Sequence, residues 1–241
     1  MQTYKEALSR ASYPGRGIVL GLSPDGASAF ILYFIMGRSQ NSRNRVFVED
    51  GDGIRTQAFD PAKLVDPSLV IYRPVRVQSG YTVVTNGDQT DTVADALGAP
   101  ASADEAFERF AAALRTRRFE PDAPHYTPRV SAILAASPAP AFAMSILKSA
   151  DGDPAECLRY TFVYEAPRPG VGRFLHTYQG DGAPLPSFAG EPESVRLPAS
   201  LDELAQGAWD ALDAQNRVSL FARSVCLKTG ATETRIINQN Q

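Results

Sequence analysis

A polar segment after a run of β-branched residues holds the first side chains suited to chemistry. The stretch Tyr81–Thr85 ends in an Asn-Gly pair, and an amide, a hydroxyl and a carboxylate follow on Asn86, Thr90 and Asp91. Asn-Gly predicts a tight turn with positive φ angles, and Thr90 or Asp91 is a suitable N-cap for a helix beginning at Thr92. Free N–H groups and polar side chains at such a junction suit a polar or anionic ligand, although many junctions of this kind bind none.

Arginines form the second candidate. Arg16 precedes one predicted strand, and Arg38, Arg43 and Arg45 follow the next strand in a predicted loop. The planar guanidinium group donates paired hydrogen bonds that fit a phosphate. A solvated loop with surface charge is the simpler explanation of the same residues.

The third candidate lies between a predicted helix and a predicted strand, in a loop stiffened by prolines. Glu120 stands at its start and Thr127-Pro128-Arg129 at its end. Pro128 restricts this position to the beginning of the strand. The preceding helix ends in arginines, so a surface ion pair is the alternative role for Glu120.

Common signatures of catalytic sites are absent from the sequence. It has no Walker loop, no glycine-rich dinucleotide turn, no Gly-x-Ser-x-Gly elbow and no zinc-type cluster. The two histidines, His125 and His176, are not spaced like metal ligands, so we expect no metal site. His125 lies in the third candidate segment, where a role in catalysis and a plain loop position both remain open.

Strand-like segments dominate the chain and predict the elements that position these residues. Turn residues between the first two, and again between the next two, predict hairpins. The predicted strands are Gly17–Leu22, Ser28–Met36, Leu69–Val77, Tyr81–Thr85, Val130–Ala136, Ala141–Lys148, Cys157–Glu165, Arg173–Tyr178, Val218–Cys226 and Thr232–Ile237.

Two amphipathic helices are predicted after capping boxes that begin at Ser102 and Ser200, and a shorter helix over Thr92–Leu97. The proline- and glycine-rich stretch Gly180–Pro198 predicts a long surface loop, either a lid or an interface element. Strands such as Ile31–Met36 are apolar on both faces, which indicates sheets covered on both sides. We therefore predict the α+β class, with antiparallel sheets in a layered sandwich.

Composition indicates a soluble globular protein, with one domain spanning residues 1–241. Apolar residues make up 44% of the chain and charged residues 21%, and the net charge of −3 argues against nucleic acid as a partner. No apolar run reaches membrane-spanning length and the N-terminus lacks a signal-peptide layout, so we expect no membrane partner and a cytoplasmic location. Cys157 and Cys226 are predicted to be buried free thiols.

Taken together, the three candidate segments resemble the archaeal-type IMP cyclohydrolase family. The resemblance runs from residue 13 to about 134 and is looser at Gly172-Arg173 and Tyr178. The residues before Tyr13, a longer arginine loop and the stretch Gly180–Pro198 depart from the family pattern. The matching motifs are Tyr13-x-Gly15-Arg16, Arg38-Ser39, Asn44-Arg45, Tyr72 in its strand, Val83-Val84-Thr85-Asn86-Gly87-x-x-Thr90-Asp91, Phe119-Glu120 and Tyr126-Thr127-Pro128-Arg129-Val130-x-Ala132-Ile133-Leu134.

This resemblance implies a four-layer αββα sandwich similar to N-terminal-nucleophile hydrolases, without a processed nucleophile. It implies a cyclohydrolase that closes the ring of 5-formamidoimidazole-4-carboxamide ribonucleotide to give IMP and water in purine biosynthesis. The carboxamide nitrogen attacks the formyl carbon, and the tetrahedral intermediate loses water. Such a reaction needs positioning, a donor to the developing oxyanion and a proton acceptor, and it needs no cofactor.

The resemblance also assigns roles to the matched residues. Glu120 is the general acid or base, Tyr72 donates to the formyl oxygen, and Arg38 holds the 5′-phosphate or stabilises negative charge. The substrate-binding residues it implies, which hold the phosphate, the ribose or the carboxamide, are Arg16, Arg45, Asn86, Thr90, Asp91, Thr127 and Arg129.

Two other functions remain open for the same residues. One is an amidohydrolase that acts on a different small amide, and the other is a non-catalytic protein that binds purine nucleotides. Retention of Glu120 and Tyr72 beside the arginines favours an enzyme over a binding protein. The partner that we expect is a purine ribonucleotide, and a homo-oligomer stays open.

Overall fold

Two antiparallel sheets stacked face to face form the centre of the protein in this computed structural model, which describes residues 1–65, 67 and 70–241. Within that part of the chain the first sheet has six strands in the order β11-β10-β1-β2-β12-β13. They are β1 (Arg16–Leu22), β2 (Ser28–Met36), β10 (Val171–His176), β11 (Glu193–Arg196), β12 (Arg217–Cys226) and β13 (Thr232–Asn238).

The second sheet has seven strands among the described residues, in sequence order from β3 to β9. They are β3 (Arg45–Asp50), β4 (Gly53–Ala58), β5 (Val75–Gln78), β6 (Tyr81–Thr85), β7 (Arg129–Ala135), β8 (Ala141–Ala150) and β9 (Asp153–Tyr164). Every described pairing between neighbouring strands is antiparallel, as the hairpin-rich sequence predicts.

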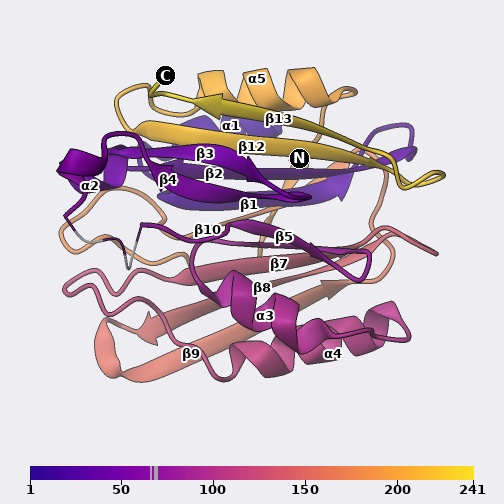
Figure 1. Cartoon of the computed structure of the whole chain (residues 1–241), viewed down its shortest axis with the longest axis horizontal. Helices are drawn as coiled ribbons and strands as arrows, with labels where there is room; N and C mark the ends of the chain where they lie inside the picture. The colour runs from indigo at the N-terminus through magenta and orange to yellow at the C-terminus, as the bar shows by residue number, and fades with distance from the viewer. Residues whose placement is uncertain (66, 68–69) are drawn as a thin grey trace.

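Helices cover the outer face of each sheet. The helices α1 (Tyr4–Arg10) and α5 (Leu201–Ala211) pack on the six-stranded sheet, and α3 (Gln89–Leu97) and α4 (Ala103–Leu114) pack on the seven-stranded sheet. Figure 1 shows α5 at the top and α3 and α4 at the bottom, with the strands between them. The predicted α+β class and the αββα layering are confirmed.

The alternation along β2 shows why its strand is apolar on both faces. Leu32 and Phe34 pack toward α1 and α5, whereas Ile31, Tyr33 and Ile35 face the second sheet in the central core. Successive side chains of a strand point to opposite faces, so a strand between two apolar layers cannot alternate with polar residues. The hairpin of β1 and β2 forms as predicted.

The second predicted hairpin is shorter than expected. Its first strand begins at Val75, directly after Pro74, which has no N–H group to donate to a sheet. Tyr72 consequently lies in an irregular segment, and its predicted place in a strand is wrong. Leu69, where the strand was predicted to begin, lies outside the described residues.

The helix after Asn86 begins earlier than predicted. It spans Gln89–Leu97, and Asp88 occupies the N-cap position without a side-chain hydrogen bond to the helix. Neither Thr90 nor Asp91 is therefore the cap, because both lie in the first turn. Asn86 and Gly87 do not adopt positive φ angles, so the predicted turn geometry is also wrong.

Several elements escaped the sequence prediction. The segment expected to be an arginine loop contains the short helix α2 (Gln40–Arg43) and enters β3 at Arg45, and β3 and β4 form a hairpin. The helix α1 was also missed, although Thr3 and Glu6 form a complete capping box at its start.

The stretch Gly180–Pro198 is only partly the surface loop that was predicted. It contains β11, and the side chains of Leu185 and Phe188 are buried. The two cysteines are free, as expected, but each is half-buried. None of the helices in the described part of the chain is long and apolar enough to span a bilayer.

Candidate active site

A cavity of about 330 Å³ lies at the end of the sandwich where β1 begins and where β2 and β10 end. The register brings these three ends together, because Gly17 of β1 is paired with Phe34 of β2 and with His176 of β10. The connection from α4 to β7 closes the other side. The lining residues are Tyr13, Arg16, Arg38, Ser39, Asn41, Ser42, Val70, Glu120, Asp122, His125, Thr127, Tyr178 and Leu185.

Aromatic rings and a guanidinium group form one wall of the cavity. The Arg38 guanidinium lies 4.7 Å from the centre of the Tyr13 ring, and Tyr13 stacks on Tyr178 with ring centres 6.0 Å apart. Gly15 makes this wall possible, because its φ is +79° and a Cβ atom there would come within 2.6 Å of the Tyr178 ring. The glycine of the Tyr13-x-Gly15-Arg16 motif is thus explained by close approach.

Arg16 brings a second positive charge to the same cavity. Its Nε atom is buried and has no hydrogen-bond partner among the described residues. Burial opposes the charged form, but the surrounding tyrosines, Tyr178 and Tyr13 foremost, outweigh burial, and the pKa of Arg16 is raised. Arg16 therefore remains a cation with a donor to spare.

Arg45 lies close to Arg16 but behind the cavity wall. Its side chain is fully buried, and its Nε atom donates to the Ser42 carbonyl at 2.7 Å. Its Nη1 and Nη2 atoms have no hydrogen-bond partner in the described part of the chain. Burial is the main cause that lowers the pKa of Arg45, with Arg16 adding to it and Tyr72 opposing it. Buried charge without a partner is costly, so this guanidinium group suits an anion.

Tyr72 lies beside these arginines, and it too is absent from the cavity lining. Its hydroxyl group is hydrogen-bonded to the hydroxyl of Tyr33 at 2.8 Å, and its N–H donates to Thr56 Oγ1. Tyr72 is thus hydrogen-bonded within the protein, next to the two arginines. The expected donation to the substrate would need a change in these contacts.

Glu120 is the buried carboxyl group of the cavity. Its Oε2 accepts a hydrogen bond from Arg129 Nη2 at 3.1 Å, and both side chains are about one-tenth exposed, at 10% and 9%. Burial raises the pKa of Glu120, and Arg129 and Arg16 only partly oppose it. A carboxyl group whose pKa is raised in a cavity is suited to hold and deliver a proton.

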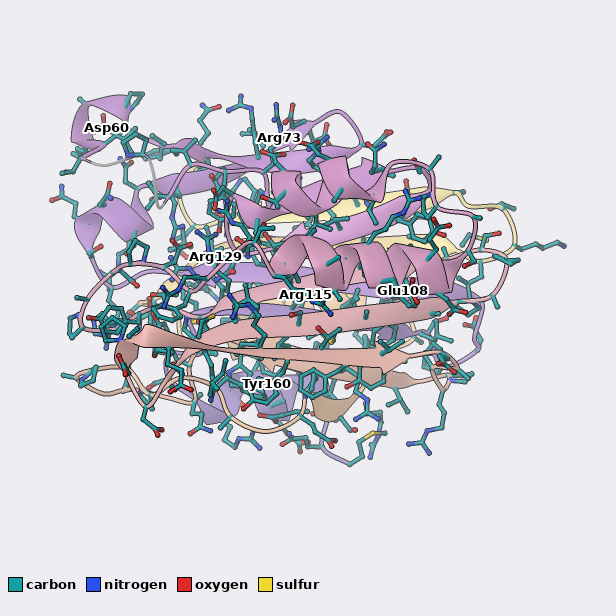
Figure 2. All side chains as sticks on the ribbon, turned by 90° about the horizontal axis from the view of Figure 1, so that it is seen from below. Asp60, Arg73, Glu108, Arg115, Arg129 and Tyr160 are labelled. Carbon is teal, nitrogen blue, oxygen red and sulfur yellow. The ribbon has the colours of Figure 1, made fainter. Side chains whose placement is uncertain are left out.

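Arg129 ties Glu120 to the start of α3. Its Nη1 donates to Asp88 at 2.7 Å and also to Gln89 Oε1. A Cβ atom on Gly87 would come within 2.5 Å of the Arg129 Nη1 atom and within 3.1 Å of Glu120 Oε1, so a larger residue there would have to displace these side-chain ends. Figure 2 shows Arg129 near the end of α4 that carries Arg115 and away from Glu108.

The predicted residues of the Asn-Gly segment bond to the protein and do not line the cavity. Asn86 accepts from the Val130 N–H and donates to the Pro128 carbonyl, both at 2.9 Å. The Thr90 hydroxyl bonds to Thr85 at 2.6 Å. Asp91 pairs with Arg76 at 2.8 Å on the outside of α3. The structure therefore brings Arg16, Arg38, Glu120 and Thr127 to the cavity and leaves the other candidates behind or outside it.

Asp122, Tyr178 and His125 line the cavity but were not among the predicted site residues. Asp122 accepts from the Thr127 N–H at 2.6 Å and also from the Thr127 hydroxyl, and Thr127 Oγ1 lies 2.5 Å from the Tyr178 hydroxyl oxygen. His125 Nδ1 accepts from the Leu185 N–H at 3.2 Å, which attaches the stretch Gly180–Pro198 to the cavity rim. Asp122 and His125 lie in the third candidate segment, so the position of that segment could have identified them as candidates.

The chain matches the family model described as IMP cyclohydrolase-like protein over residues 13–229. The chain belongs to this family. The match extends well past the motifs visible in the first half and includes Tyr178 and the stretch Gly180–Pro198, whereas α1 lies before it. A search of curated proteins found no match. No group of three or more His, Cys, Asp and Glu side chains among the described residues is placed to bind a metal ion.

Proposed function

We propose that this protein closes the ring of 5-formamidoimidazole-4-carboxamide ribonucleotide to give IMP and water. One observation carries the proposal: Glu120, whose pKa is raised by burial, shares a cavity with the cations Arg16 and Arg38. A volume of about 330 Å³ is within the usual range for small-molecule sites. Membership of the family supports the same reaction.

The cations bind the 5′-phosphate in this proposal. Arg16 and Arg38 contact it from the cavity wall, and Arg45 adds positive potential from behind that wall. Tyr72, whose hydroxyl group is hydrogen-bonded to that of Tyr33, contributes to the polar surroundings of Arg16 and Arg45. Fixing the phosphate at one end places the reacting carboxamide and formyl groups at the other, and this positioning lowers the barrier to ring closure.

Glu120 acts on the formyl oxygen. The carboxamide nitrogen attacks the formyl carbon, and protonated Glu120 gives its proton to the oxygen as negative charge develops there. Arg129 orients the Glu120 carboxyl group from the side facing α3. Asn86 and Thr90 hold the backbone of that junction, so their contribution is to position Arg129 and Glu120.

The direct test is to mix purified protein with the formamido ribonucleotide and to follow IMP formation by absorbance. We expect turnover well above the uncatalysed background, a loss of about 10²–10⁴-fold in kcat for Glu120→Gln, and a raised KM for Arg38→Ala. Glu108→Gln, at an exposed position of α4, and Arg115→Ala, at its exposed C-cap, are matched controls that should keep wild-type rates.

Absence of any acceleration by the wild-type protein would overturn the proposal. A thermal-shift measurement with IMP would then decide between a nucleotide-binding protein and a different amide chemistry, because a ligand of the folded state raises its apparent stability. Full turnover and unchanged substrate affinity in both Glu120→Gln and Arg38→Ala would leave the reaction intact and show that the site lies elsewhere.

A further inference from the structure

Three oxygen-bearing side chains in the cavity wall form a continuous hydrogen-bonded chain. The Thr127 hydroxyl donates to Asp122 Oδ2, and Thr127 Oγ1 lies 2.5 Å from the Tyr178 hydroxyl oxygen. All three residues line the cavity, where Glu120 is the other carboxyl group besides Asp122 among the described lining residues. Asp122 is half-buried, whereas Thr127 and Tyr178 are buried. The chain therefore joins the interior of the cavity to a group that solvent can reach.

The direction of each hydrogen bond in this chain follows from elementary chemistry. An ionised carboxylate has only acceptors, so Thr127 must give its hydroxyl hydrogen to Asp122. Thr127 Oγ1 is then free to accept, and the hydrogen in the short contact belongs to Tyr178. Burial raises the pKa of Tyr178 to about 12, so the phenol keeps its hydrogen at neutral pH. Tyr178 consequently offers an acceptor lone pair to a ligand in the cavity.

We propose that Tyr178, Thr127 and Asp122 form a proton relay that accepts the hydrogen lost by the attacking nitrogen of the substrate. Tyr178 is the catalytic residue of the relay, and Thr127 and Asp122 act through it. This inference rests on the proposed cyclohydrolase function. It supplies the proton acceptor that ring closure needs and that Glu120, acting as the acid, cannot be in the same step.

The transfers balance over the whole reaction. As the carboxamide nitrogen bonds to the formyl carbon, its hydrogen passes to Tyr178 Oη, the phenol hydrogen passes to Thr127 Oγ1, and the hydroxyl hydrogen passes to Asp122 Oδ2. Glu120 protonates the former formyl oxygen. In the dehydration the relay runs in reverse and protonates the departing hydroxyl group, the C–O bond breaks, and Glu120 takes the hydrogen of the other ring nitrogen. Water leaves, and both carboxyl groups regain their starting forms.

Two substitutions at one position separate the relay from a structural role. Thr127→Val keeps the shape of the side chain and removes the hydroxyl, whereas Thr127→Ser keeps the hydroxyl. We expect kcat to fall by about 10²-fold or more in Thr127→Val and in Tyr178→Phe, and to stay near wild type in Thr127→Ser. Thr161→Val, at an exposed position of β9, is the matched control.

The dependence of kcat on the deuterium fraction, measured in mixtures of light and heavy water, would not change if the three residues had only a structural role. Because several hydrogens are transferred in one step, we expect kcat to depend on the deuterium fraction along a curve in the wild type and in Thr127→Ser. We expect a linear dependence in Thr127→Val and in Tyr178→Phe, with calorimetric affinity for IMP retained in both.

Each contrary result has its own meaning. Wild-type kcat with curved dependence in Thr127→Val and Tyr178→Phe would overturn the relay and leave the cyclohydrolase function standing. A parallel loss of IMP affinity and kcat in Thr127→Val, Thr127→Ser and Tyr178→Phe would also overturn it, because the three residues would then only hold the cavity together. Failure of the wild-type protein to form IMP would overturn the relay together with the function.

Discussion

Two clusters of buried polar side chains lie next to the cavity and differ in how fully they are hydrogen-bonded. We define the junction cluster as Asn86, Gln89, Thr90, Glu120 and Arg129, and the arginine cluster as Arg16, Arg45, Tyr33 and Tyr72. In the junction cluster the side chains bond mainly to one another and to β7. In the arginine cluster three guanidinium nitrogens have no hydrogen-bond partner among the described residues.

This difference indicates that the two clusters have different roles. Buried groups that lack a hydrogen-bond partner are expensive, so a folded protein keeps them where a ligand, an ion or a water molecule completes the bonds. A completed network, by contrast, has little left to offer a ligand and holds its neighbours in a single geometry. The other members of the junction cluster therefore hold Glu120 in one geometry, whereas the arginine cluster has donors that suit an anion. One Arg129 nitrogen, Nε, is also without a described partner, although the other two make three hydrogen bonds.

Arg129→Met should have the largest effect on stability. It removes the hydrogen-bond donor of buried Glu120 and of two further acceptors, and each polar group left unsatisfied in the interior costs about 1–3 kcal/mol. The free energy of unfolding from urea titration measures it, with Arg115→Met on the exposed end of α4 as control. A loss as small as that of the control would show that the junction cluster does not stabilise the fold.

The contacts of Glu193 with His176 and Arg10 should have an intermediate effect on stability, and that effect should depend on pH. The hydrogen bond from His176 is the largest cause that lowers the pKa of Glu193 to about 2, and Arg10 adds to it. A lowered carboxyl pKa stabilises the folded state above the unfolded value of 4.5, and the contribution is lost as pH falls toward 2. Glu193→Gln should therefore lower the free energy of unfolding at pH 7 by on the order of 2 kcal/mol.

The difference between wild type and Glu193→Gln should shrink as the pH is lowered below 4.5. Urea titrations from pH 7 to pH 3.5 test this, and Glu191→Gln, at an exposed position two residues away, is the control. An effect of Glu193→Gln that is constant over this range would mean that the carboxylate charge contributes nothing to stability.

Local sequence patterns predicted the elements whose cause is local. Phe30–Met36 has to be a doubly buried strand, and Ser102 and Ser200 start helices through their own hydroxyl groups. The hairpin of β3 and β4 was missed because its arginines suggested a solvated loop, although Asp50-Gly51-Asp52-Gly53 is a strong turn signal.

The contacts that define the cavity could not be predicted in the same way. Thr127 and Tyr178 are 51 residues apart, and only the packing of the two sheets brings them into contact. The motif positions identified the cavity residues Arg16, Arg38, Glu120 and Thr127, yet they did not separate these from Asn86 and Thr90. The spacing of the motifs predicts which residues lie close together in the folded protein. It does not record which of them faces the ligand, because that depends on hydrogen bonds made across the fold.

Arg45→Met should have the smallest effect on the ligand-free protein, and this makes it the sharpest test of the comparison. Removing a buried charge whose terminal nitrogens are unpaired is neutral or stabilising, so the free energy of unfolding should change by less than about 1 kcal/mol or rise. Arg223→Met is the matched control, because Arg223 is also buried in a strand but donates to Asp52 and Thr234. The Arg223→Met variant should lose about 1–3 kcal/mol in its free energy of unfolding.

The Arg45→Met variant should also lose much of the stabilisation that a bound anion gives the wild-type protein. Ribose 5-phosphate should raise the melting temperature of the wild-type protein and of Arg223→Met, and raise that of Arg45→Met less, because the positive charge behind the cavity wall is gone. Destabilisation of ligand-free Arg45→Met as large as that of Arg129→Met would contradict the comparison. It would mean that the Arg45 charge is already neutralised within the folded chain, and the arginine cluster would then be a second scaffold of the same kind as the junction cluster.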